Sequence, residues 1–142
     1  MKKRSGRHDA IRSIVRSKRI RTQRALVDEL KELGYVCTQA TVSRDISEMG
    51  LRKLPEGMYV LAEDLHLQRM VSDLVIDVRR SDNLILIKTV SGNGPGVGAA
   101  LDAADFPGLM GSLAGDDTIL VIAETGEDGQ SFQDMVQKLR AV

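Results

Sequence analysis

The stretch Thr38-Gln39-Ala40-Thr41-Val42-Ser43-Arg44-Asp45-Ile46-Ser47-Glu48-Met49-Gly50 decides the fold of this chain. Thr38 is a residue type that caps helix N-termini, and Gly50 is the type that most often follows a helix C-terminus. Between them, Val42, Ile46 and Met49 recur at helical spacing and predict one buried face. The opposite face carries short or planar polar groups near the helix N-terminus, at Gln39, Ala40, Thr41, Ser43 and Arg44.

Two further helical patterns precede this stretch, and a hairpin pattern follows it. The second helix begins at Thr22 and stops at Gly34, so a short link joins it to the third helix, as in a helix-turn-helix. Residues 51–54 and 58–61 flank the turn sequence 55–57, which predicts a hairpin. The apolar residues expected to face inward are Ile11, Ile14 and Val15 in the first helix and Leu26, Leu30 and Leu33 in the second. Three helices followed by a hairpin predict a winged helix.

The outer face of the third helix suits DNA. Gln39 can pair with adenine and Arg44 with guanine, while the methyl groups of Ala40 and Thr41 can touch thymine and the hydroxyl of Ser43 can reach a phosphate. A small solvated polar helix is the alternative, and a helix that binds a protein partner more often presents large apolar anchors. The basic residues around the helix and the hairpin after it favour DNA.

Charge and composition separate the chain into two halves. Residues 1–64 carry 14 Lys and Arg against 9 Asp and Glu, and the remainder carries 6 against 11, so a net charge of zero hides +5 and −5. No apolar run approaches the length of a membrane span, and no apolar stretch follows the basic residues 1–4, so we expect no secretory signal and a cytoplasmic protein. The single Cys37 has no partner at zinc-ligand spacing, and we expect neither a metal nor a cofactor.

The C-terminal half predicts a small α+β domain. Residues 65–72 form a linker or short helix, and strands, helices and turns then follow in the order β-β-α-β-β-α. This order predicts a two-layer domain with helices on one face of the sheet, and self-association would cover the other face. Residues 84–90 are almost continuously aliphatic, which predicts a central strand buried on both faces.

Two motifs in this half have competing interpretations. Gly94-Pro95-Gly96-Val97-Gly98-Ala99 resembles a relaxed dinucleotide fingerprint, but the preceding strand belongs to a hairpin, so we interpret it as a turn before a helix. Asp116 and Asp117 are adjacent carboxylates that either cap a turn or await a cation. An organic cation fits at least as well as a metal, because the two histidines, His8 and His66, lie outside the segment. A small enzyme that acts on an amino acid or nucleotide through these aspartates remains an alternative.

These residues resemble the bacterial arginine repressors over nearly the whole chain. The resemblance lies in two stretches, Thr38 to Ile46 and Gly111-Ser112-Leu113-Ala114-Gly115-Asp116-Asp117-Thr118-Ile119. It implies a winged-helix DNA-binding domain at 1–64, a linker or short helix at 65–72, and an arginine-binding oligomerisation domain at 73–142. A winged-helix regulator whose C-terminal half binds no ligand and only oligomerises is the second alternative.

The resemblance also implies partners and site residues. It implies a homo-hexamer of two stacked trimers, with L-arginine bound between them as co-repressor, on operators of arginine biosynthesis genes, and a role in regulating arginine catabolism. One departure is Pro95, which stands where the family often has a glutamine that holds the amino acid. The expected DNA-binding residues are Gln23, Thr38, Gln39, Ala40, Thr41, Ser43, Arg44 and Lys53, and the expected arginine-binding residues are Asp102, Ser112, Ala114, Asp116 and Asp117.

Overall fold

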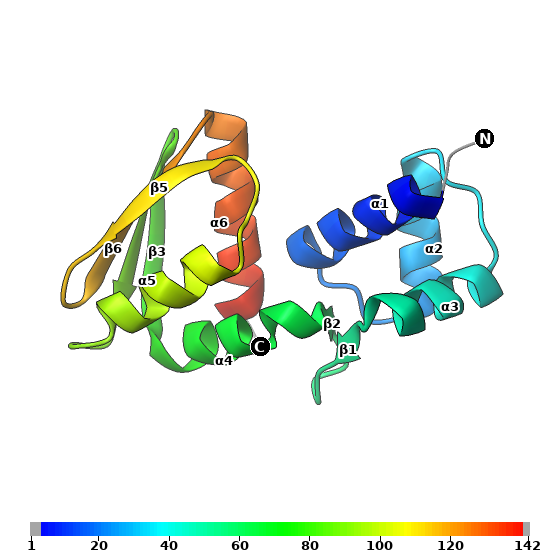
Figure 1. The fold of residues 1–142 in the computed structure, drawn as a ribbon, viewed down its shortest axis with the longest axis horizontal. Helices are drawn as coiled ribbons and strands as arrows, with labels where there is room; N and C mark the ends of the chain where they lie inside the picture. The colour runs from blue at the N-terminus through cyan, green and yellow to red at the C-terminus, as the bar shows by residue number, and fades with distance from the viewer. Residues whose placement is uncertain (1–3, 141–142) are drawn as a thin grey trace. The chain divides into compact units, whose positions relative to one another are not determined.

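The computed structural model describes residues 4–140 and divides the chain into two compact units, Met1–Ala62 and Glu63–Val142 (Figure 1). Residues 1–3, which form most of the basic N-terminus considered above, lie outside the described residues. The division falls after Ala62, close to the boundary expected after residue 64. The segment 65–72, expected to be a linker or short helix, lies within helix α4 (Leu65–Leu74) and belongs to the second unit.

The first unit is a helix-turn-helix followed by a small wing. Its elements are α1 (Arg4–Ser17), α2 (Gln23–Glu32), α3 (Gln39–Met49), β1 (Arg52–Lys53) and β2 (Tyr59–Val60), and the two strands pair antiparallel. The expected caps are present: Thr22 accepts a hydrogen bond from the amide of Ala25, and Thr38 accepts one from the amide of Thr41. Gly50 ends α3 with φ of 69°, a left-handed conformation that glycine adopts without strain.

A small aliphatic core holds the three helices together. Ile11 of α1, Leu26 and Leu30 of α2, and Val42 of α3 are fully buried in it. The prediction that Leu33 also faces inward is wrong, because its side chain is 48% exposed. The helix ends at Glu32 and Leu33 is its C-cap, so the backbone has already left the helical path that would return this side chain to the core.

The second unit is an antiparallel sheet with helices. The short 3-10 helix η1 (Ala62–Asp64) spans the division between the units. The second unit then contains α4, β3 (Val75–Ser81), β4 (Leu84–Thr89), α5 (Gly94–Ala103), β5 (Leu109–Ala114), β6 (Thr118–Ala123) and α6 (Gly126–Arg140). The strand order is β3-β4-β6-β5, so the strand that we expected to be central, β4, is an inner strand. This arrangement confirms the predicted α+β class.

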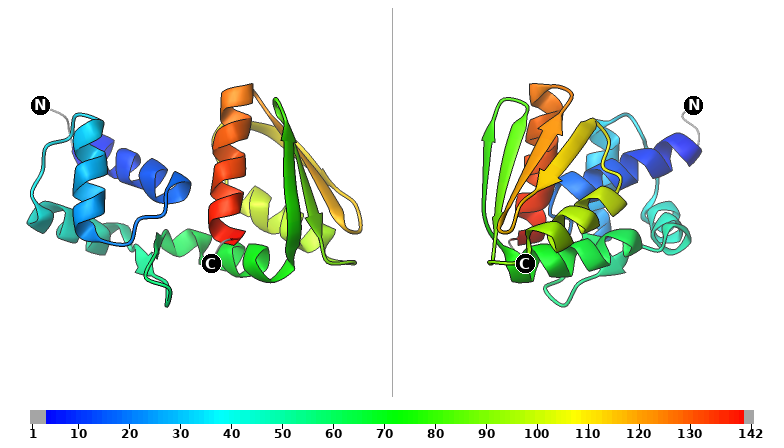
Figure 2. Two further views of the ribbon diagram at one scale, coloured as in Figure 1. Left: turned by 180° about the vertical axis from the view of Figure 1, so that it is seen from behind. Right: turned by 60° about the vertical axis from the view of Figure 1, so that its left-hand side comes forward.

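Helices α5 and α6 cover only one face of this sheet (Figure 2). Ile85, Ile87, Ile119 and Val121 are buried on that face. The prediction that residues 84–90 are buried on both sides is wrong for the isolated chain, since Leu84, Leu86 and Val90 are 42%, 38% and 44% exposed. The alternating burial follows because no described element of this unit packs on the other face.

The uncovered side of the sheet carries a contiguous apolar surface. We call it the open face and define it by Leu84, Leu86, Leu113, Leu120 and Ile122. These residues are neighbours by register, because Leu84 pairs with Ile122 while Leu120 pairs with both Leu86 and Leu113. Leu113 is 72% exposed, and Leu120 and Ile122 are half-buried. Contiguous exposed aliphatic surface of this kind is typical of interaction sites.

The helical layer contains a buried amine. Lys138 of α6 is 4% exposed, and burial lowers its pKa to about 8, against the opposing effect of the Asp64 carboxylate. Asp64, at the N-terminus of α4, is equally buried. The charged form of Lys138 is therefore less stable in the folded chain than in the unfolded one.

We expect this lysine to make folding more stable at high pH. Between pH 8 and 10.5 the unfolded chain binds more protons at Lys138 than the folded chain, so the free energy of unfolding rises with pH in that window, by up to about 3 kcal/mol. Urea titrations at pH 7 and pH 10.5, at one protein concentration, measure the change. Lys138→Met should remove this rise in the free energy of unfolding. An equal rise in the variant would show that Lys138 is not its source.

Candidate functional site

Helix α3 presents the predicted reading surface. Gln39, Ala40, Ser43 and Arg44 are exposed and Thr41 is half-buried, while Val42 faces the core. This pattern of exposure follows from the helical period. Val42 points toward α2 and the core, so the residues before and after it point to other faces of the helix. The exposed groups lie in the first half of the helix, which is the end that a helix-turn-helix inserts into the major groove.

Thr38 and Thr41 also have a structural task at the start of α3. Thr38 Oγ1 accepts a hydrogen bond from the Thr41 amide at 3.2 Å and lies 3.1 Å from Thr41 Oγ1. Thr38 thereby satisfies one of the free amides at the helix N-terminus. Its exposed hydroxyl is on the same end of the helix as Gln39.

The two remaining predicted DNA-binding residues flank this helix in the fold. Gln23 is the first residue of α2 and is half-buried. Lys53 lies on β1 of the wing and is exposed, with Nζ 5.3 Å from the centre of the Tyr59 ring. The wing turn is closed by the Gly57 amide, which donates to the Leu54 carbonyl at 2.7 Å. Lys53 is thus an exposed cation on a hydrogen-bonded hairpin.

Two of the predicted arginine-binding residues meet in the second unit. Ser112 Oγ of β5 donates to Asp102 Oδ1 of α5 at 2.9 Å. Both line a hollow of about 160 Å³, together with Asp105, Phe106 and Met110. The hollow combines carboxylates with apolar walls, which suits a cation carried on an aliphatic stem.

Asp116 lies in a separate place, at the turn between β5 and β6. Its Oδ2 accepts hydrogen bonds from Ser91 Oγ at 3.1 Å and from the Gly92 amide at 3.2 Å, and its carbonyl accepts from the Gly94 amide at 2.8 Å. A Cβ at Gly94 would lie 2.0 Å from the Gly115 carbonyl oxygen, so only glycine permits this approach. The glycine sequence therefore serves close packing between the start of α5 and this turn.

Asp117 has different partners from its neighbour. Its Oδ1 accepts from Thr118 Oγ1 at 2.9 Å and lies 3.6 Å from Lys88 Nζ. The Thr118 hydrogen bond, followed by the Lys88 charge, lowers the pKa of Asp117, so its carboxylate stays ionised. The two aspartates diverge, so they do not share a proton as an acid–base pair would.

The predicted ligand residues thus occupy both ends of α5 in one protomer. Asp116 contacts the first residue of the helix, whereas Asp102 lies eight residues further, about 12 Å along the helix axis. Ala114 sits beside the helix, because a Cβ at Gly98 would lie 3.2 Å from the Cβ of Ala114. Pro95 stands in the first turn of α5, where its fixed φ suits the helix and no amide hydrogen is needed.

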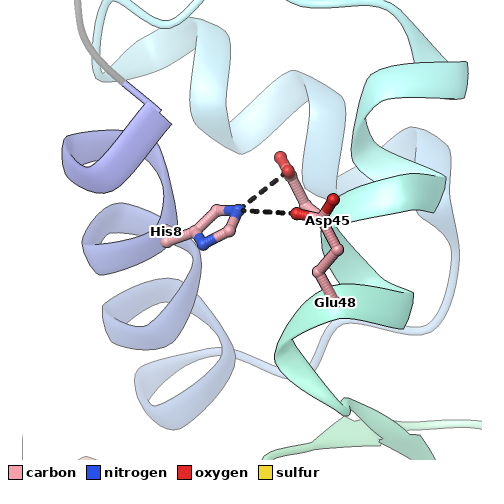
Figure 3. Close-up of side chains that lie close together, drawn as sticks. All are labelled: His8, Asp45 and Glu48. Atoms are coloured by element: carbon pink, nitrogen blue, oxygen red, sulfur yellow. Dashed lines mark hydrogen bonds and ion pairs between the residues drawn. The ribbon is translucent and has the colours of Figure 1, made fainter.

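The sequence interpretation missed the cluster behind α3. Asp45 is buried and bound by Arg7 and His8, and His8, Asp45 and Glu48 are the one group among residues 4–140 whose side chains are spaced to hold a metal ion (Figure 3). The sequence did contain a sign of this cluster: Asp45 follows Val42 by three residues and therefore lies on the apolar face of α3. Within the same residues, no helix has both the length and the apolar content needed to cross a bilayer.

Two family models match the chain. The model described as the arginine repressor DNA-binding domain matches residues 1–67, and the model described as the arginine repressor C-terminal domain matches residues 71–138. The matches meet within α4, near the division between the two structural units. Together they account for almost every residue.

Curated relatives give the same result. Proteins named arginine repressor are 45% identical in Thermus thermophilus, over 90% of this chain and 85% of the relative, and 42% identical in Clostridium botulinum, over 94% and 95%. The arginine repressor of Bacillus subtilis is 40% identical over 94% of this chain and 96% of its own length. With its winged-helix unit, its α+β unit and these matches, the chain belongs to the arginine repressor family.

Proposed function

We propose that the chain is a transcriptional repressor whose α3 enters the major groove of operator DNA while the wing contacts the backbone. The exposed face formed by Gln39, Ala40, Thr41, Ser43 and Arg44 carries this proposal. Gln39 and Arg44 supply the planar donors that read adenine and guanine, and Ser43 and Thr38 supply hydroxyls for phosphates. Lys53 on the wing and Gln23 at the start of α2 extend the contact to the phosphates on either side.

L-arginine is the co-repressor in this proposal, and no other cofactor takes part. A guanidinium is planar and pairs with a carboxylate through two parallel hydrogen bonds, which Asp116 and Asp117 offer at the surface. Asp102, Ser112 and Ala114 hold the amino-acid end. Because Asp102 and Asp116 lie at opposite ends of α5 on one protomer, residues from different subunits complete each ligand site.

The assembly that brings these ends together is a homo-hexamer of two stacked trimers. The open face supports this part of the proposal, since Leu84, Leu86 and Leu113 need cover. In a closed symmetric assembly the same contacts repeat at every interface, so the open face of every subunit is covered in the same way. Bound arginine neutralises carboxylates in the acidic second unit, so the ligand tightens the assembly that it occupies.

The biological target is the set of operators that control arginine biosynthesis genes, with regulation of arginine catabolism as a second output. The repressor works in the bacterial cytoplasm and catalyses no reaction. Its divergent aspartates weigh against the enzyme alternative, because Asp116 and Asp117 have separate partners and do not form an acid–base pair. The two acidic groups, one at Asp102 and one at Asp116, weigh against a second unit that only oligomerises and binds no ligand.

The test of DNA reading is Arg44→Ala. We expect operator affinity to fall roughly 5- to 150-fold, because a bidentate arginine–guanine contact is worth about 1–3 kcal/mol. Sites are first selected from a random duplex library with L-arginine present, and affinities are then measured by fluorescence anisotropy. Arg69→Ala, an exposed arginine of α4, is the matched control. Equal losses in both variants would contradict reading by α3.

A further inference from the structure

Asp45 is a buried carboxylate on the reading helix. Its side chain is 1% exposed, although the adjacent Arg44 is exposed. A carboxylate removed from water is costly unless a cation and hydrogen bonds compensate for the lost hydration. The position therefore requires partners, and they come from another helix.

Those partners are two consecutive residues of α1. Arg7 donates from Nε to Asp45 Oδ2 at 2.5 Å and from Nη2 to Oδ1 at 2.9 Å, which is a bidentate pair. His8 Nε2 lies 2.9 Å from Asp45 Oδ1 and 3.8 Å from Glu48 Oε2 (Figure 3). We call Arg7, His8, Asp45 and Glu48 the helix clamp, because two side chains of α1 hold two of α3.

The bidentate pair is fully ionised. Burial alone would raise the pKa of Asp45, but the hydrogen bonds from Arg7 and His8 outweigh it and lower that pKa. The Asp45 hydrogen bond also raises the pKa of Arg7. Two parallel charge-assisted hydrogen bonds fix distance and orientation together, which a single contact does not.

The clamp is better suited to holding the helix than to holding a metal. Three of its side chains have the spacing of metal ligands. Both oxygens of Asp45 are already bound by the Arg7 guanidinium, however, and a divalent cation at the same place would meet that positive charge. A metal would have to displace Arg7 first.

We propose that Arg7 and His8 are positioning residues for DNA recognition, which they serve by fixing α3 through Asp45 and Glu48. This inference rests on the proposed function of α3. The clamp holds the helix from its inner side, one residue from Arg44, so the reading face is oriented without either residue touching DNA.

A double-mutant cycle tests the positioning role in the full chain with the selected operator. Arg7→Gln and Asp45→Asn should each weaken binding by about tenfold, in the range of couplings within one network. The double variant, which leaves no unpaired buried charge, should bind no more weakly than the worse single variant. Additive losses, near a hundredfold, would overturn the proposal, and so would undiminished binding by Arg7→Gln. Failure of the wild type itself to select any operator would instead contradict the proposed function.

The salt dependence separates positioning from phosphate contact. Each phosphate contact that is removed lowers the slope of log affinity against log salt by about one. Lys53→Ala should show that loss, whereas Arg7→Gln should keep the wild-type slope. A lowered slope in Arg7→Gln would make Arg7 a DNA contact and overturn the clamp. Circular dichroism and thermal unfolding of each variant establish that the helices remain folded.

A pair of histidine variants tests the contribution of His8 at a single pH. His8→Ala removes one partner of Asp45 and a neighbour of Glu48, so operator binding should weaken roughly fivefold. His66→Ala, at an exposed histidine of α4, is the matched control and should bind as the wild type does. Undiminished binding by His8→Ala, or stabilisation of the wild type by added zinc chloride, would overturn the proposal.

Discussion

Replacing Leu86 by glutamate is expected to convert the proposed assembly into monomers. Leu86 lies near the middle of the open face, where it pairs with Leu120 and is 38% exposed in the single chain. Covering the exposed 38% of this side chain contributes about 0.6–1.1 kcal/mol per subunit, in proportion to the value for full burial. Glutamate removes that contribution and would bring a charge from each subunit into an apolar interface, where it has no opposite charge to pair with.

Sedimentation velocity at several protein concentrations measures this loss of assembly. Val36→Glu is the matched control, because Val36 is also an exposed aliphatic residue, 86% accessible, but belongs to the first unit. Circular dichroism should be the same for both variants and the wild type. A Leu86→Glu protein that keeps the wild-type sedimentation coefficient would contradict assembly through the open face.

Changing Asp116 to asparagine is expected to abolish the response to arginine. Asparagine keeps an acceptor for the Ser91 hydroxyl and the Gly92 amide, so the turn is preserved, but it removes the charge that a guanidinium needs. L-arginine at a hundred times its dissociation constant should stabilise the wild type by about 2.7 kcal/mol per site. The variant should show no arginine-dependent stabilisation and only weak, arginine-independent DNA binding.

Ligand and residue controls make this result specific. Lysine offers a point charge and citrulline none, so neither should stabilise the wild type as arginine does. Asp73→Asn, at an exposed aspartate of α4, should respond normally to arginine. A full response in Asp116→Asn would show that this carboxylate is not the partner of the guanidinium. The absence of any response in the wild type would contradict the co-repressor proposal, and Pro95 would be the first residue to exchange.

Features set by local sequence were predictable, and features set by distant partners were not. The ends of α2 and α3 followed from Thr22, Thr38 and Gly50, because a cap needs only residues within one turn. The arginine that binds Asp45 lies 38 residues away, and no spacing rule connects them. Apolar content alone does not tell which face of a strand has a covering layer, which is why Leu84 and Leu86 were expected to be buried.

The candidate ligand site shows the same distinction. The residues from Gly111 to Asp117 were identifiable by their type and order, yet their placement depends on α5. Asp116 is anchored to the loop before that helix and Asp102 to Ser112 near its end. Asp116 and Asp117 are adjacent in the sequence, but their carboxylates have separate partners in the structure, because the two side chains point in different directions.

The division of the chain after Ala62 has a consequence for synthesis on the ribosome. The first unit is compact by itself and consists of residues that are translated first, so it can fold while the rest of the nascent chain is still being added. The second sheet has to wait, because β4 pairs with β6 across the intervening α5 and β5. Each newly made chain should therefore leave the ribosome with its DNA-reading unit complete but its apolar sheet newly formed and uncovered. The onset of repression after a burst of translation should then depend on how quickly released chains encounter one another.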